Sequence, residues 1–126
     1  MAAVLNKSFQ INKETGGLFD ITIQPLMRLW GFYREQGQNN APDTTRIKAF
    51  LNGTTGMDKI RLNKNWLSKK NNHVEIDLNG IAQGYSVDIV ADFIEAKNIT
   101  SYVFELGGEI RAKGPKPDGS NIKIGI

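Results

Sequence analysis

Residues 77–88, DLNGIAQGYSVD, constrain the fold of this chain more than any other stretch. They follow an extended-looking segment and open a run whose apolar residues recur every three or four positions. The members of this apolar stripe are Ile81, Tyr85, Ile89, Val90, Phe93 and Ile94. A stripe of this kind must be buried against other elements. We therefore predict a long helix from Gly80 to Lys97, with Asn98 as a left-handed cap.

The start of this predicted helix is a place where a charged ligand can bind. Free backbone N–H groups at a helix N-terminus favour an anion, and an acid beside an exposed carbonyl can hold a cation. Asp77 has an alternative role, because an acid at this position also caps the helix. Gln83 lies within about the first helical turn, yet an exposed glutamine on a helix needs no function. The residues alone leave both alternatives open.

Three further helices are expected before this one. The first covers Ala3 to Thr15 and ends at Gly16-Gly17, and the second begins with Pro25 in its first turn. A polar loop from Tyr33 to Asp43 follows, and Asp43 or Thr44 then caps a helix that ends at Gly53. The pair Gly16-Gly17 before Leu18-Phe19-Asp20 has two explanations: it is only a helix stop, or it lets a ligand approach the backbone.

Period-two alternation and short apolar runs predict the strands. Residues 58–62 and 73–78 are expected to pair as an antiparallel hairpin, and the remaining strands are 102–106, 109–113 and 122–126. Gly107-Gly108 is either a β-bulge or a point of close approach, and 115–119 is a turn. The predicted fold class is α+β, an antiparallel sheet with helices packed on one side.

Composition limits the class of protein. The 126 residues predict a single domain over 1–126, and no apolar run is long enough to cross a bilayer. Without cysteine, disulfides and thiolate sites are excluded. The net charge of +3 comes from scattered lysines, so we expect no nucleic-acid partner. His73, the only histidine, is expected at the surface, and Trp30 and Trp66 are expected to be core or partly buried aromatics.

A series of ordered motifs carries a family resemblance. The motifs are GGLFDIT at 16–22, PLMRLWGF at 25–32, DLNGIAQGYSVD at 77–88, ELGGEIRAKG at 105–114 and PDG at 117–119. In this order they resemble the ApbE family, the FAD:protein FMN transferases, formerly called thiamine biosynthesis lipoproteins. The resemblance runs over nearly the whole chain and implies a T-fold-related α+β structure.

The resemblance implies a magnesium-dependent enzyme that takes FAD as substrate. Family members split its pyrophosphate, attach FMN to a threonine or serine hydroxyl of an acceptor protein and release AMP. The acceptors are flavoprotein subunits of membrane redox complexes. Two alternatives stay open: an FAD pyrophosphatase that yields FMN and AMP, and a flavin-binding module without catalysis. No catalytic residue is assigned.

The resemblance also implies site residues by motif position. Five residues are expected to contact FAD: Leu18, Phe19, Asp20, Asp77 and Gln83. Gly80 is expected to offer its backbone carbonyl to Mg²⁺. Gln83 departs from the lysine that many members carry at this position.

Family chains are longer than this one, which leads to further expectations. They carry an N-terminal signal or lipid-anchor segment, and a later portion that completes the metal site. By this comparison the chain is a central fragment, truncated at both ends, and without transferase activity by itself. The implied location is the periplasmic or extracytoplasmic face of the cell membrane, with membrane attachment only through the lipid anchor.

Overall fold

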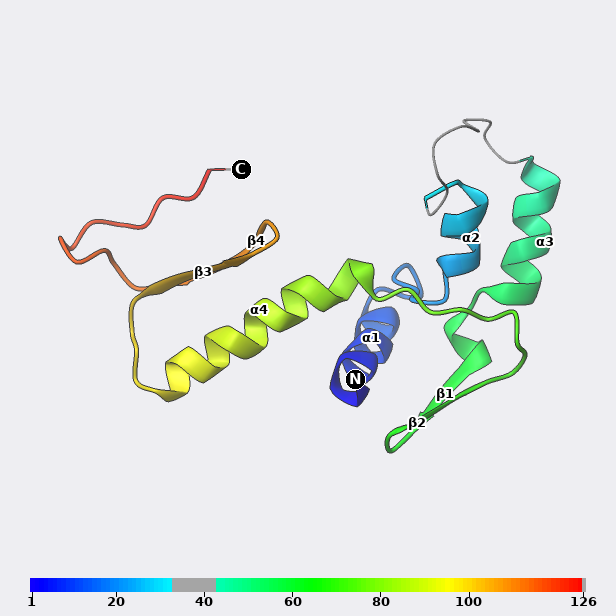
Figure 1. The fold of residues 1–126 in the computed structure, drawn as a ribbon, viewed down its shortest axis with the longest axis horizontal. Helices are drawn as coiled ribbons and strands as arrows, with labels where there is room; N and C mark the ends of the chain where they lie inside the picture. Colours follow the sequence, from blue (N-terminus) through cyan, green and yellow to red (C-terminus); the bar gives the residue numbers. More distant parts are fainter. Residues whose placement is uncertain (33–42, 126) are drawn as a thin grey trace. The chain divides into compact units, whose positions relative to one another are not determined.

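The computed structural model describes residues 1–32 and 43–125. Its contacts divide the chain into two compact units, Met1–Gly80 and Ile81–Ile126, and the ribbon is drawn in Figure 1. The single domain expected over 1–126 stays a prediction. Residues 33–42 of the predicted polar loop lie outside the described residues. Within the described part of the chain, none of the helices has the length and apolar character needed to span a membrane.

The first unit begins with the predicted helix, α1 (Ala2–Glu14). Its inward face carries Leu5 and Ser8, which are both buried. The glycine stop is confirmed, because Gly16 and Gly17 adopt φ values of 61° and 91°. The Gly17 N–H donates to the Asn12 carbonyl at 2.8 Å, which satisfies a carbonyl that the helix leaves without an intrahelical partner.

Two shorter helices of the first unit also follow the predictions. Helix α2 (Gln24–Leu29) has Pro25 in its first turn, and helix α3 (Thr44–Thr54) packs against it. The cap of α3 is Asp43, whose carboxylate accepts a hydrogen bond from the Thr45 N–H at 3.3 Å. Fixed φ at the proline and a side-chain acceptor at the cap explain why the sequence located both starts.

The predicted hairpin has a different second strand. A short 3₁₀ turn, η1 (Met57–Lys59), leads into β1 (Ile60–Asn63), which pairs with β2 (Trp66–Lys69). The predicted partner, 73–78, forms no strand: residue 73 is in a turn and 74–78 have no regular secondary structure. The alternation of apolar and polar residues predicts that one side of this segment is buried, and Val74 is fully buried. The alternation does not predict which other segment lies beside it. The neighbouring segment is the one before α2, where the Ile21 carbonyl accepts a hydrogen bond from the Asp77 N–H at 2.7 Å.

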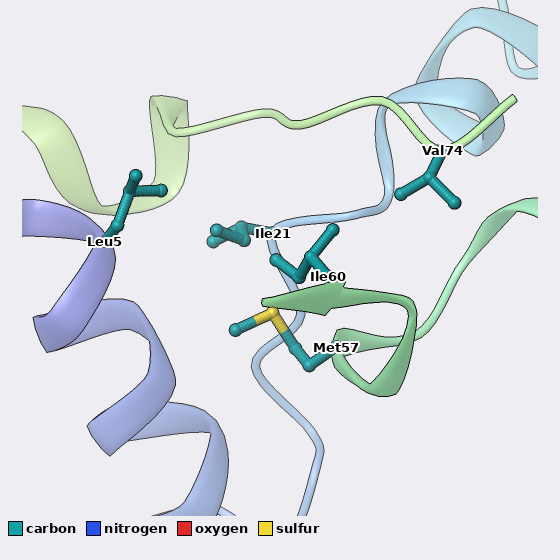
Figure 2. Close-up of a cluster of buried hydrophobic side chains, with 5 residues drawn as sticks. All are labelled: Leu5, Ile21, Met57, Ile60 and Val74. Atoms are coloured by element: carbon teal, nitrogen blue, oxygen red, sulfur yellow. The ribbon is translucent and has the colours of Figure 1, made fainter. Parts of the chain in front are cut away.

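The core of the first unit gathers side chains from each of these segments. Figure 2 shows this buried cluster, formed by Leu5 of α1, Ile21, Met57, Ile60 and Val74. Partly buried side chains pack around this cluster, namely Phe9, Phe19, Leu62, Leu67, Ile76 and Leu78. Both tryptophans lie outside it, with Trp30 53% and Trp66 82% exposed. The expectation of a core or partly buried aromatic is therefore wrong for Trp66, which directly follows the hairpin turn, whereas Trp30 is half-buried.

The long helix is confirmed as α4 (Asn79–Ala96), and Asn98 has the predicted left-handed conformation, with φ of 60°. Its buried face differs from the predicted stripe. The buried residues are Ile81, Val87 and Ala91, of which only Ile81 belongs to the stripe, whereas Ile89 and Phe93 are 51% and 63% exposed. The apolar pattern covers more than one side of this helix, so spacing alone did not decide which side is buried.

The second unit also holds a hairpin, β3 (Tyr102–Leu106) with β4 (Glu109–Lys113). Both strands were predicted. Gly107 and Gly108 form the two-residue turn between them, with φ values of 59° and 94°, so the β-bulge is excluded. Residues 122–125 form no strand, contrary to the prediction, and Ile126 lies outside the described residues.

Helix and hairpin of the second unit are joined by charged side chains. Arg111 of β4 forms ion pairs with Asp88 and Asp92 of α4, both at 3.1 Å. Glu95 of α4 pairs with Lys113 and accepts a hydrogen bond from the Tyr102 hydroxyl at 2.6 Å. The hydrogen bond from Lys113, and then that from Tyr102, lower the pKa of the Glu95 carboxyl to about 2.

The α+β class is confirmed, since helices occur together with antiparallel strands. The single predicted sheet is not found in the described residues, where β1–β2 and β3–β4 form separate two-stranded sheets. The predicted turn at 115–119 is present, with the Lys116 N–H donating to the Ser120 carbonyl at 2.8 Å.

Candidate functional site

The loop that follows α1 is held by two polar side chains of that region. The Asn12 side-chain amide donates to the Phe19 carbonyl at 2.6 Å, and the Thr15 hydroxyl accepts from the Phe19 N–H at 3.1 Å. Both groups fix the backbone of the loop rather than its side chains. Sequence analysis missed these two residues, because an amide and a hydroxyl near a helix end carry no signal of what they will bind.

The Asp20 carboxylate is held by hydrogen bonds from the residue two positions later. Its Oδ1 accepts from the Thr22 N–H at 2.7 Å and from the Thr22 hydroxyl at 2.6 Å. Thr22 is fully buried, and its hydroxyl oxygen accepts in turn from the Gly56 N–H at 2.6 Å. Asp followed by Thr at this spacing is a known turn pattern, so the first contact could have been predicted. The contact with Gly56, 34 positions away, could not.

Asp77 lies beside this loop and at the start of α4. Its N–H donates to the Ile21 carbonyl at 2.7 Å, which fixes the two segments next to each other. Its Oδ1 accepts from the Asn79 N–H at 2.7 Å, so the capping role considered for this acid is observed. Capping does not exclude ligand binding, because an ionised carboxylate offers about four acceptor positions.

Phe19 and Gly80 complete the cluster. A Cβ atom added at Gly80 would lie 3.7 Å from Cε2 of Phe19, so the ring lies against the first turn of α4. Leu18, one residue before, is 91% exposed. The first unit thus brings Phe19, Asp77 and Gly80 together, with Asp20 on the same ordered loop and Leu18 open to solvent.

Gln83 belongs to the second unit. Its side-chain amide lies against the β3–β4 turn, where a Cβ atom added at Gly107 would be 2.6 Å from Nε2. Its expected part in an FAD site stays a prediction.

The donors of the cluster fit a magnesium ion only in part. Mg²⁺ prefers six oxygen ligands, and proteins supply one or two carboxylates together with water and substrate phosphates. Residues 1–32 and 43–125 contain no group of three or more His, Cys, Asp or Glu side chains placed to hold a metal. Gly80 lies in the first turn of α4, where its carbonyl is of the right chemical kind but is one ligand only.

Comparison with known proteins decides the family. The profile of the ApbE family matches residues 1–126, the entire chain. The chain belongs to the ApbE family. Its relatives include an FAD:protein FMN transferase of Haemophilus influenzae, 40% identical over 129 residues, and one of Vibrio cholerae, 37% identical over 123 residues. These alignments cover 99% and 98% of this chain but 37% and 36% of the two relatives.

Solved structures of the ApbE family have the same fold. The flavin transferase ApbE from Vibrio cholerae matches with a TM-score of 0.84 at 36% identity, covering 98% of this chain and 40% of that one. The apo flavinyl transferase ApbE from Pseudomonas stutzeri also matches with a TM-score of 0.84, at 35% identity, covering 98% and 41%. The chain therefore spans well under half the length of the ApbE proteins that it resembles.

Proposed function

We propose that this chain supplies FAD-binding residues of an FAD:protein FMN transferase. One observation carries the proposal: the ordered loop at Phe19-Asp20 is fastened to Asp77 and lies against Gly80 at the start of α4. Those are the positions to which the family motifs assign FAD and its metal. The reaction is supported by the relatives described above, which are FAD:protein FMN transferases.

The proposed reaction is a phosphoryl transfer. The bond between the two phosphates of FAD breaks, and a new P–O bond forms between the FMN phosphorus and a threonine or serine hydroxyl of the acceptor. AMP leaves with the bridging oxygen, and the hydroxyl proton is released. Such reactions depend mainly on positioning and on stabilising the charge of the phosphates. No residue of this chain is assigned to the proton.

The cluster offers complementary groups for parts of FAD. The N–H groups of the first turn of α4 favour an anionic diphosphate. The Asp77 carboxylate accepts hydrogen bonds from N–H or O–H groups of the ligand, and Phe19 and the exposed Leu18 offer apolar contact. Gln83 belongs to the second unit, and its proposed contact with FAD uses a neutral amide, which is a donor and an acceptor at once.

The proposed reaction requires Mg²⁺, and the Gly80 carbonyl is proposed as one of its oxygen ligands. When bound, the ion offsets negative charge on the phosphates. The acceptor is proposed to be a flavoprotein subunit of a membrane redox complex. The location is proposed to be the extracytoplasmic face of the membrane, with a lipid anchor. Both rest on the family resemblance alone.

A chimera tests the proposed function. Residues 1–126 replace the aligned stretch of the Vibrio cholerae FAD:protein FMN transferase, and the product is incubated with FAD, Mg²⁺ and a threonine-containing acceptor peptide. We expect covalently bound FMN on the peptide and an equal amount of AMP. Free FMN with AMP would instead indicate a pyrophosphatase, and bound but unchanged FAD would indicate a binding module. Circular dichroism of the chimera serves as the folding control.

A further inference from the structure

The two glycines of the β3–β4 turn differ in a way that their backbone does not explain. Both have the positive φ of a type I′ turn, which asparagine also adopts readily at the first position. On backbone grounds, asparagine followed by glycine would be among the most favoured pairs for this hairpin. The space around the two residues differs. Nothing lies within 4 Å of a Cβ atom added at Gly108, whereas one added at Gly107 would meet Gln83.

The contact involves the end of the Gln83 side chain. The added Cβ at Gly107 would lie 2.6 Å from Nε2, 3.3 Å from Cδ and 3.8 Å from Oε1. The amide group therefore occupies the volume that any larger residue at 107 would take. Only glycine leaves it there, because at 2.6 Å the amide must move away. Gln83 lies on α4 and Gly107 on the hairpin, so the space that the side chain occupies is left open by a residue outside its own helix.

The surrounding groups keep the turn itself in place. Glu105 Oε1 accepts from the Gly108 N–H at 2.6 Å, which fixes the turn backbone from within the hairpin. A Cβ atom added at Gly84, next to Gln83, would be 3.9 Å from the Glu109 carboxylate, so this part of α4 lies close to the end of the hairpin. We propose that Gly107 is a positioning residue, which orients the Gln83 amide for contact with FAD. This inference rests on the proposed function, which assigns Gln83 to FAD.

Gly107→Asn separates positioning from folding. The variant keeps a favoured turn pair, and the displaced atom is the flexible end of a side chain, so we expect a thermal unfolding midpoint close to that of the wild type. In NMR spectra of the 126-residue chain, the side-chain NH₂ signals of Gln83 should move. Gly108→Ala is the matched control, because it strains the same turn without meeting Gln83. Unmoved Gln83 signals in Gly107→Asn would overturn the positioning role.

FAD affinity of the chimera completes the test. Gln83→Ala and Gly107→Asn should each weaken FAD binding by about three- to tenfold, the loss expected for one hydrogen bond. The double variant should bind no more weakly than Gln83→Ala, because both changes act through the same amide. If Gln83→Ala weakens binding and Gly107→Asn does not, the positioning role is overturned. If Gln83→Ala binds FAD like the wild type, the assignment of Gln83 in the proposed function is what fails.

Discussion

Thr22 shows how one hydroxyl fixes the loop of the candidate site. It donates to Asp20 and accepts from the Gly56 N–H while fully buried, so the two partners lose contact with each other if it is removed. Both partners are partly buried, and a polar group that loses its partner in such a place is costly. The order of the Phe19-Asp20 loop therefore depends on a residue outside the family motif positions assigned to FAD.

Thr22→Val tests this dependence. The substitution keeps the shape of the side chain and removes the hydroxyl, so the free energy of unfolding should fall by about 1–3 kcal/mol. Urea denaturation measures the change. Thr22→Ser keeps the hydroxyl and loses a methyl group, at a cost of about 1 kcal/mol. A valine variant as stable as the serine variant would show that the hydroxyl is not needed.

Leu18 allows a ligand role to be separated from a structural one. Its side chain is 91% exposed, so Leu18→Ala should change the free energy of unfolding by less than about 0.5 kcal/mol. If Leu18 contacts FAD, the same variant of the chimera should bind FAD several times more weakly in a fluorescence titration. Leu51→Ala, at another exposed leucine, is the control. Equal affinity of the two variants would remove Leu18 from the site.

At the scale of elements, the sequence located helices better than strand partners. The start of α3 follows from the Asp43 cap, and the end of α1 from Gly16-Gly17, because these signals act within a few residues. The partner of β1 was predicted wrongly, because alternation shows that one side of 73–78 is buried but not which chain covers it. The closeness of Gln83 to Gly107 could not be predicted for the same reason. The two residues are distant in the sequence, and no local pattern connects them.

Attachment of α4 to the β3–β4 hairpin should depend on pH. The pKa of Glu95 is lowered from 4.5 to about 2, first by the hydrogen bond from Lys113 and then by that from Tyr102. A lowered pKa in the folded state means that this contribution to stability is complete above about pH 4.5 and is lost as the pH falls through about 2.

Glu95→Gln tests that attachment by thermal unfolding between about pH 2 and pH 7. The wild type should unfold at a higher temperature than the variant above about pH 4.5, and the difference should vanish near pH 2. Lys113→Met removes the first cause of the shift, so Glu95→Gln should lower the unfolding temperature less in that background than in the wild type. A difference that is constant over the whole pH range would contradict the account.

At the scale of the whole molecule, the chain corresponds to one part of the longer ApbE proteins. It matches the family over all of its residues and covers 36–41% of the four relatives described above. The sequence motifs were sufficient to recognise the family, since they depend on residue order alone. The arrangement of Phe19, Asp77 and Gly80 required the structure, because a backbone hydrogen bond from Asp77 to Ile21 brings these distant positions together.

We propose that the loop at Phe19-Asp20 and the helix start at Asp77 bind the flavin substrate. The most direct measurement is the rate of covalent FMN transfer by the chimera carrying Asp77→Asn. Asparagine can still cap α4, so the fold is kept while the charge is lost. The control is Asp58→Asn, which removes the same charge from an exposed acid paired with Lys70. We predict a rate or FAD affinity at least about tenfold lower for Asp77→Asn, as for a lost hydrogen bond to a charged group, and little change for Asp58→Asn. Transfer and FAD binding at wild-type levels in Asp77→Asn would contradict the account.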